Sequence, residues 1–264
     1  MHRNASSFRE SPSTRIPAGS VEDLYKTIRS DILESGDTRQ NRVSQPWRQL
    51  PVEIHRSVNS TKKHLYVVTS IHLHAFWSKS RANGPGLRAV AWLQGCTLGC
   101  PGCFNPETHS KDGASRVTVE SLASRLLQLG TSVEGLTLTG GEPLEQALAV
   151  KELLEELRAH SQLSVLIFSG YKIEEIRNLD HGPEILSLID VLVDGRYVES
   201  QHLARGLRGS HNQRIHLLSS RYCLAEIERT PMSEVSIAAN GEVRVTGVEP
   251  LRVPGAADHQ TRNA

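Results

Sequence analysis

Three cysteines lie close together in the segment Gly95-Cys96-Thr-Leu-Gly-Cys100-Pro-Gly-Cys103-Phe-Asn105. The glycines and the proline make this loop tight and pliant. Thiolates bind iron–sulfur clusters, which usually take four cysteines, so three leave one iron without a protein ligand. An open metal position is typical of a catalytic centre, since a small molecule can then coordinate directly. We therefore expect Cys96, Cys100 and Cys103 to be metal ligands.

Two other interpretations of these cysteines stay open. A zinc ion would need a fourth ligand, for which His109 is suitably close in sequence. A thioredoxin-like redox pair formed by Cys100 and Cys103 would leave Cys96 unexplained. The fourth cysteine, Cys223, lies far away, and the odd cluster of three argues against a disulfide framework. We expect Cys223 to be a small buried residue.

A second motif, Thr139-Gly140-Gly141-Glu142-Pro143, follows a predicted strand. Its two glycines let backbone N–H and C=O groups approach a ligand that side chains would block. A Gly-Gly turn after a strand is usually only a turn. This one comes about forty residues after a cysteine loop that also ends a strand, and the combination is more specific to a ligand site.

The two motifs are placed by alternating strands and helices. Strands are predicted at 65–76, 87–94, 135–139, 164–169 and 189–195, and helices at 119–129, 144–157 and 173–176. This alternation predicts an α/β fold with parallel strands, whose ligands collect at the carboxyl ends of the strands. We therefore expect the cysteine loop, the Gly-Gly-Glu-Pro turn, Ser169-Gly170-Tyr171 and Asp194-Gly195 to face one pocket.

The two ends of the chain differ from this central part. Residues 1–62 are rich in Ser, Arg, Asn and Pro and predict a polar, mostly disordered extension with one helix, Val21 to Ser35. The folded domain is expected over 63–250, ending in a hairpin that turns at Asn240-Gly241. Residues 251–264 are expected to be a disordered tail.

Composition excludes some classes of protein. Thirty basic and 29 acidic residues give a net charge of +1, so there is no global electrostatic reason to expect nucleic acid or an anionic membrane as partner. No apolar run approaches the roughly 20 residues that span a bilayer, and the polar opening lacks the apolar segment of a secretory signal. We expect a cytoplasmic protein.

Taken in order, the motifs resemble the radical S-adenosylmethionine (SAM) superfamily, and within it the activases of anaerobic ribonucleotide reductase. Gly102, Phe104 and Asn105 match the activase branch, which places Pro-Gly before the third cysteine and an aromatic residue plus Asn after it. The resemblance extends over six blocks: Gly84–Gly86, Trp92–Cys96, Cys100–Glu107, Gly140–Pro143, Ser169–Tyr171 and Asp190–Arg196.

The resemblance implies a partial (β/α) barrel that carries a [4Fe–4S] cluster and SAM. Cys96, Cys100 and Cys103 would bind three irons while SAM chelates the fourth. The turn Gly140, Gly141, Glu142 and Pro143 would hold the methionine part of SAM, Ser169 and Tyr171 would lie near its nucleoside, and Asn105 would be a further cofactor contact. Asp194 either binds a cation or the SAM amino group, or caps its turn.

The implied activity is reductive cleavage of SAM to a 5′-deoxyadenosyl radical, which takes a hydrogen atom from a glycine of a partner enzyme. A flavodoxin or ferredoxin would supply the electron under anaerobic conditions. Two alternatives remain: the same radical chemistry on a peptide, tRNA or small molecule, and a non-catalytic zinc-binding interaction module. Residues 1–62 and the segment after Arg196 depart from compact activases and leave the partner open. In that segment Arg208 or Arg214 either pairs with a carboxylate or lies in a solvated loop.

Overall fold

A computed structural model describes residues 68–237, 243–249 and 257–258, and every structural statement below concerns these residues. The predicted helix at 21–35, the order of the N-terminal extension and the turn at Asn240-Gly241 lie outside them. Most of the predicted tail lies outside them too. Ala257–Asp258 (β12), which falls within that tail, is a short strand.

The centre of the described part is a seven-stranded sheet in the order β3-β1-β2-β4-β5-β6-β9. Its four middle strands are parallel: β2 (Arg88–Leu93), β4 (Gly135–Gly140), β5 (Ser164–Ser169) and β6 (Val191–Asp194). Three strands at the sides are antiparallel to their neighbours: β1 (Ser70–Ser80), β3 (Ser115–Thr118) and β9 (Arg214–Leu217). The α/β class and the parallel centre are confirmed. Because β3 and β9 are the two ends of the strand order, a barrel is not confirmed.

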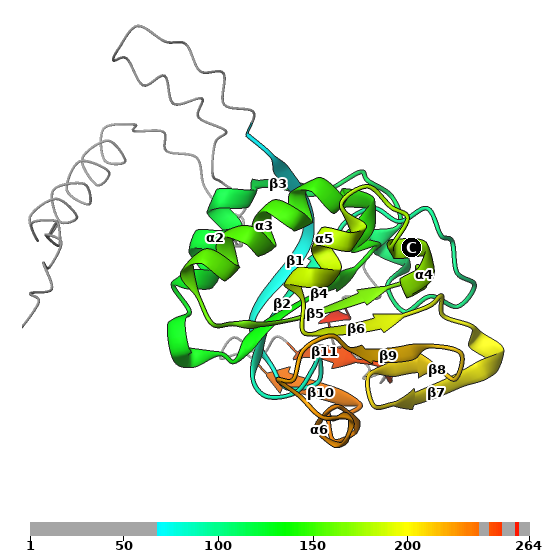
Figure 1. The fold of residues 1–264 in the computed structure, drawn as a ribbon. Helices are drawn as coiled ribbons and strands as arrows, with labels where there is room; N and C mark the ends of the chain where they lie inside the picture. The colour runs from blue at the N-terminus through cyan, green and yellow to red at the C-terminus, as the bar shows by residue number, and fades with distance from the viewer. Residues whose placement is uncertain (1–67, 238–242, 250–256, 259–264) are drawn as a thin grey trace, which may run out of the picture. The chain divides into compact units, whose positions relative to one another are not determined.

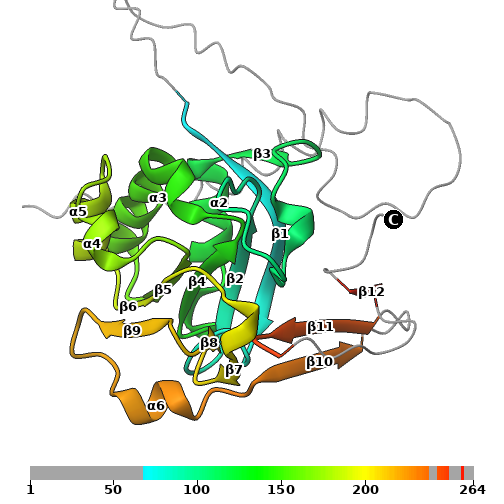
Figure 2. The same cartoon turned by 90° about the vertical axis from the view of Figure 1, so that its right-hand side faces the viewer.

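Four helices lie together on one face of this sheet (Figures 1 and 2): α2 (Val119–Leu127), α3 (Ala147–His160), α4 (Ile173–Ile176) and α5 (Gly182–Leu188). The longest, α3, turns Val150, Leu153 and Leu157 towards the sheet, and each is at most 1% exposed. Thr118 caps the start of helix α2, where its hydroxyl accepts the N–H of Ser121. None of the described helices is long and apolar enough to cross a membrane.

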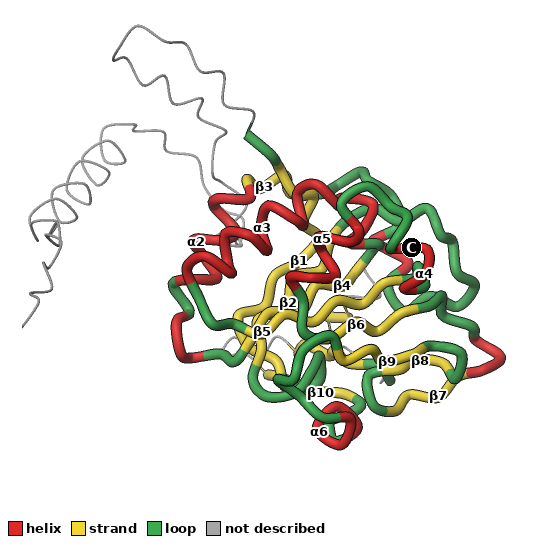
Figure 3. The backbone as a smooth tube through the Cα atoms, viewed as in Figure 1, coloured by secondary structure: helices red, strands yellow, loops and turns green. Residues whose placement is uncertain are grey.

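The opposite face of the sheet is covered by hairpins and one short helix (Figures 2 and 3). These elements are β7 (His202–Arg205) with β8 (Arg208–Ser210), α6 (Leu224–Glu228), and β10 (Ser233–Ile237) with β11 (Val243–Gly247). Strand residues alternate between the faces, so Leu166 and Val193 meet Leu207 and Ile227 here, whereas Ile167 faces the helices. The antiparallel strands of the predicted C-terminal hairpin are confirmed.

The buried side chain of Arg88 links three of the parallel strands by hydrogen bonds. The Arg88 side chain is fully buried, and its guanidinium donates to Thr137 Oγ1 at 2.9 Å, Ser164 Oγ at 2.7 Å and the Leu136 carbonyl at 2.7 Å. Burial lowers the pKa of Arg88, while the nearby Tyr222 acts in the opposite direction. The cation thus joins β2, β4 and β5 at their amino-terminal half.

Candidate metal and cofactor site

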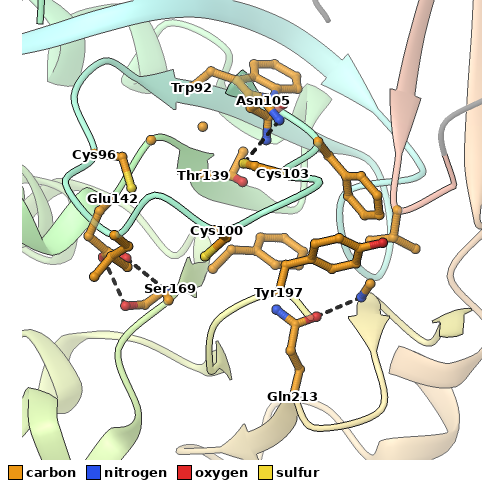
Figure 4. A pocket seen from close by; sticks show the side chains of 18 of the residues that line it. Trp92, Cys96, Cys100, Cys103, Asn105, Thr139, Glu142, Ser169, Tyr197 and Gln213 are labelled. Carbon is orange, nitrogen blue, oxygen red and sulfur yellow. Dashed lines mark hydrogen bonds between the residues drawn. The ribbon is translucent and has the colours of Figure 1, made fainter. Parts of the chain in front are cut away.

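A cavity of about 160 Å³ lies at the carboxyl ends of the parallel strands. Four loops line it: the cysteine loop, Gly140–Glu142, Ser169–Gly170 and Gly195. These are the four loops expected to share one pocket, so that prediction is confirmed. Figure 4 shows the side chains of Cys96, Cys100 and Cys103 around this space, with Glu142 and Ser169 joined at one side of it.

Backbone contacts fix the shape of the cysteine loop. The N–H of Gly95 donates to the Thr108 carbonyl at 2.7 Å, and that of Cys96 donates to the His109 carbonyl at 3.0 Å. A turn follows in which the Cys103 N–H donates to the Cys100 carbonyl at 3.2 Å. Gly95, Gly99 and Gly102 all have positive φ, which side chains disfavour. The loop therefore returns on itself and brings all three thiols to one cavity.

Burial alone favours the neutral form of the thiols, so their ionisation depends on a bound metal. Burial raises the pKa of Cys96 to about 11 and also raises the pKa of Cys103. The Asn105 backbone N–H donates to the Cys103 sulfur at 3.4 Å, which favours the thiolate. Metal coordination requires thiolates and offsets the cost of burying them. Three half-buried thiols from one loop, one already accepting an N–H bond, therefore fit an iron–sulfur cluster.

The described residues do not form a zinc site. His109 lines the same cavity, but the described residues contain no group of three or more His, Cys, Asp or Glu side chains that could hold a single metal ion. A cluster makes a different demand, because its cysteines bind separate irons rather than one shared ion.

The Gly-Gly turn packs directly on the cysteine loop. A Cβ on Gly141 would collide with the Gly95 carbonyl oxygen, and one on Gly140 would lie 2.6 Å from the Leu93 backbone nitrogen. The Gly141 N–H donates to the Leu93 carbonyl at 2.8 Å, and the Glu142 N–H donates to that of Gly95 at 2.9 Å. The two glycines therefore allow the turn to pack backbone against backbone on the cysteine loop, and both line the cavity.

Glu142 joins the ends of two strands. Its carboxylate is 1% exposed and accepts three bonds, from Leu144 N at 2.9 Å, Ser169 Oγ at 2.9 Å and Gly170 N at 2.7 Å. Burial raises the pKa of Glu142 to about 7, against which the two backbone N–H groups and the Ser169 hydroxyl act. Glu142 thereby holds the β4 turn to the β5 turn, and it fixes the position of Ser169.

Three of the proposed cofactor contacts lie away from the cavity wall. Asp194 is 2% exposed, and its carboxylate accepts the Ile173 N–H at the start of α4 at 2.7 Å and lies 3.0 Å from His216 Nε2. Pro143 is buried behind Glu142, and Tyr171 packs against the core on the helix side. Asn105 and Ser169 do line the cavity.

The structure adds wall residues that the sequence motifs did not indicate. Tyr197 packs against Phe104 with ring centroids 4.5 Å apart and ring planes tilted by 45°. Gln213 accepts the Gly209 N–H at 2.8 Å and donates to the Gly195 carbonyl at 2.9 Å. A weak signal for Tyr197 existed, since it follows Gly195 closely in the chain. Other additions include Asn83, Phe168, Leu207, Gly209 and Val245–Val248.

Two further expectations have a clear outcome. Arg208 pairs with a carboxylate, Glu228 Oε1 at 3.0 Å, and lies outside the cavity wall. The expectation that Cys223 is buried is wrong. Cys223 is exposed at the start of α6, where its N–H donates to Glu226 Oε2 at 2.7 Å. A capping residue stands outside its helix, and here the apolar contact of α6 is made by Ile227 instead.

Comparison with known proteins places the chain in a family. Residues 82–216 match the family described as 4Fe-4S single cluster domain. The anaerobic ribonucleoside-triphosphate reductase-activating protein of Enterobacteria phage T4 is 36% identical over 50% of this chain and 85% of its own length. The chain belongs to the radical SAM activase branch of this family. The activating protein of the same name from Vibrio cholerae is 32% identical over 55% of this chain and 97% of its own length. The pyruvate formate-lyase-activating enzyme of Staphylococcus epidermidis is 39% identical over 34% of this chain and 38% of its own length.

The chain is an enzyme of the radical SAM type, and an iron–sulfur cluster is the cofactor of its family. The matched block begins in the loop before β2 and ends in β9, so it contains the cysteine loop and the Gly-Gly-Glu-Pro turn. One wall of the activase cavity, Val245–Val248, lies beyond the block.

Proposed function

We propose that this activase cleaves SAM reductively and generates a glycyl radical on a partner enzyme such as anaerobic ribonucleotide reductase. The observation that carries the proposal is the meeting of three thiols and an open Gly-Gly turn on one cavity. When bound there, the cluster and SAM supply a one-electron cleavage that yields methionine and a 5′-deoxyadenosyl radical, while the protein binds, orients and shields.

The residues have separate roles in this proposal. Cys96, Cys100 and Cys103 hold three irons and leave the fourth to the amino and carboxylate groups of SAM. Gly140 and Gly141 offer backbone groups to the methionine part, and Glu142 positions the turn. Ser169 and Asn105 are proposed further contacts to SAM. For Pro143, Tyr171 and Asp194 we propose support of the site from behind the wall, in place of direct cofactor contact.

Several wider features belong to the same proposal. The functional domain is proposed to extend over 63–250 with a partial (β/α) barrel, and the enzyme to work in an anaerobic cytoplasm with a flavodoxin or ferredoxin as electron donor. The names of the relatives support the choice of partner, since they are activating proteins for a ribonucleotide reductase and for pyruvate formate-lyase.

Anaerobic reconstitution with iron and sulfide tests the cofactor. We expect about four irons per chain and formation of 5′-deoxyadenosine when SAM and dithionite are added. Cys100→Ala should lose both, because one thiolate ligand is missing. Cys223→Ser is the matched control: it changes an exposed cysteine at the start of α6 and should retain both. Zinc content without SAM cleavage would refute the proposal and leave the interaction module.

The partner is tested by adding the anaerobic ribonucleotide reductase of the organism that encodes the chain. Electron paramagnetic resonance should then show a glycyl radical on the reductase that depends on SAM and on Cys100. Deoxyadenosine without that radical would exclude this partner and favour the alternative substrates, a peptide, tRNA or small molecule.

A further inference from the structure

The cavity has one wall that the matched block does not supply. Val245, Thr246, Gly247 and Val248, from β11 and the residue that follows it, line the cavity, although the block ends at residue 216. In Figure 4 this strand, drawn in pale red, runs on the side of the cavity away from Cys96, Glu142 and Ser169. The β10–β11 hairpin therefore faces the proposed cluster and SAM from across the cavity.

A hydrogen-bond network attaches this hairpin to the loop after β1. Glu234 Oε2 accepts from Ser80 Oγ and from the Arg81 N–H, both at 2.7 Å. Glu234 and Thr246 are direct partners in the hairpin register, so their side chains share one face. The amide of Asn83, itself a wall residue, donates to Thr246 Oγ1 at 2.9 Å and to Ser80 Oγ at 2.9 Å. These hydrogen bonds hold the hairpin in a fixed position against the end of β1 and the loop that follows it.

The end of β11 is bent into the cavity by its last residue. Gly247 has a φ of +130°, and a Cβ there would collide with the Met232 carbonyl oxygen. The Val248 N–H donates to that same carbonyl at 2.8 Å. Val248 is 8% exposed and lines the cavity. This turn brings a second apolar side chain, beside Val245, to the wall.

The charge of the lining restricts the kind of substrate that this wall suits. Among the described lining residues there is no Lys or Arg, and the one carboxylate is Glu142, whose oxygens already accept three bonds. Phosphate groups are recognised mainly by Arg, Lys and arrays of N–H donors. A lining without Lys or Arg therefore suits an uncharged peptide segment better than tRNA or a phosphorylated metabolite. The side-chain amides of Asn83 and Gln213 are already bonded within the protein and hold the wall in place.

We infer that the β10–β11 hairpin is the substrate-side wall of this activase, on which Val245, Thr246 and Val248 position an uncharged peptide segment of the partner for hydrogen-atom removal. The inference rests on the proposed function and adds to it the residues that select and hold the target. A segment held against this wall presents a glycine Cα towards the cofactor side. If the segment is not held, the 5′-deoxyadenosyl radical takes a hydrogen atom from another source, and no glycyl radical forms.

The test counts glycyl radicals per 5′-deoxyadenosine formed, with the reconstituted activase and the reductase named above. Thr246→Val removes the acceptor for the Asn83 amide while keeping the shape, and Thr246→Ser keeps the acceptor. Val248→Ala shortens the side chain and so moves this part of the cavity wall back. We expect the ratio to fall about tenfold in Thr246→Val and Val248→Ala, as small misplacements of reacting groups do, and to stay at the wild-type value in Thr246→Ser.

Val235→Ala is the matched control. Val235 pairs with Val245 in the same hairpin, is 45% exposed and does not line the cavity, so this variant should keep the ratio. Unfolded molecules make neither product, and the ratio therefore does not depend on the folded fraction. Wild-type ratios in both Thr246→Val and Val248→Ala would overturn the inference and leave the proposed function intact. Deoxyadenosine without any radical in the wild type would instead refute the proposed partner.

Discussion

Glu142 makes the stability of the cluster-free protein depend on pH. Its pKa is raised from 4.5 to about 7, chiefly by burial, so the folded state binds the proton more tightly than the unfolded state. The contribution to stability is fully present below the unfolded value of 4.5 and is lost as the pH rises through about 7. A shift of this size corresponds to about 3 kcal/mol in the free energy of unfolding.

Glu142→Gln tests this reasoning because the amide cannot ionise. One amide nitrogen must then face the Ser169 hydroxyl and Leu144 N–H or the Gly170 N–H, which costs about 1 to 3 kcal/mol at every pH. Urea denaturation of the cluster-free proteins measures both free energies. The advantage of the wild type over the variant should shrink by about 2.5 kcal/mol between about pH 5 and about pH 8.

The control is Glu174→Gln, which changes an exposed glutamate of α4 and should keep the wild-type dependence on pH. A gap between wild type and Glu142→Gln that stays constant from acid to alkaline conditions would refute the reasoning. It would mean that water or a local rearrangement reaches the carboxylate and removes the cost of burial.

Three other predictions concern stability and the cluster. Arg88→Ala leaves its buried acceptors unpaired and should lower the free energy of unfolding by about 3 to 5 kcal/mol, whereas Arg81→Ala, at an exposed side chain, should change it by less than about 0.5 kcal/mol in the same urea titration. Gly141→Ala places a methyl group against the Gly95 carbonyl and should lower the iron content after reconstitution. Gly113→Ala meets nothing within 4 Å and adds only local backbone strain at a φ of +78°, away from the cavity wall, so it should retain the iron content. Removing iron from the reconstituted protein with a chelator should lower the melting temperature, since a group that binds only the folded state stabilises it; an unchanged melting temperature would contradict binding at a folded site.

Much of the framework was predictable because its signals are local. The apolar runs at β4 and β5 and the leucine spacing of α3 are each contained in one short segment, and their bounds were predicted to within a few residues. Elements that depend on distant partners were missed. Strand β9, in a polar stretch, forms by pairing with β6, and β3 forms by pairing with β1. The four residues of β9 do alternate between polar and apolar types, but this run is too short to indicate a strand without its partner, and β3 has a single apolar residue.

The same division holds within the site. Cys96, Cys100, Cys103 and the Gly-Gly-Glu-Pro turn were identified from the sequence, because their residue types and spacing are chemical signatures contained in short segments. That they line one cavity followed from a general rule about the carboxyl ends of parallel strands. Their roles as ligands of a cluster and of SAM remain predictions that reconstitution will test.

Only the tertiary structure decided which neighbours complete the cavity. The sequence left Asp194 open between a ligand and a turn cap, and the structure adds a contact that neither indicated: its carboxylate accepts the Ile173 N–H at the start of α4. Val245 and Thr246 showed only the pattern of a hairpin, and nothing in it indicated where the hairpin would lie. Their place on the wall comes from contacts of Glu234 and Thr246 with a loop about 150 residues away in sequence. Motifs contained in a short segment can be recognised from the sequence, whereas contacts between distant segments form only when the chain folds.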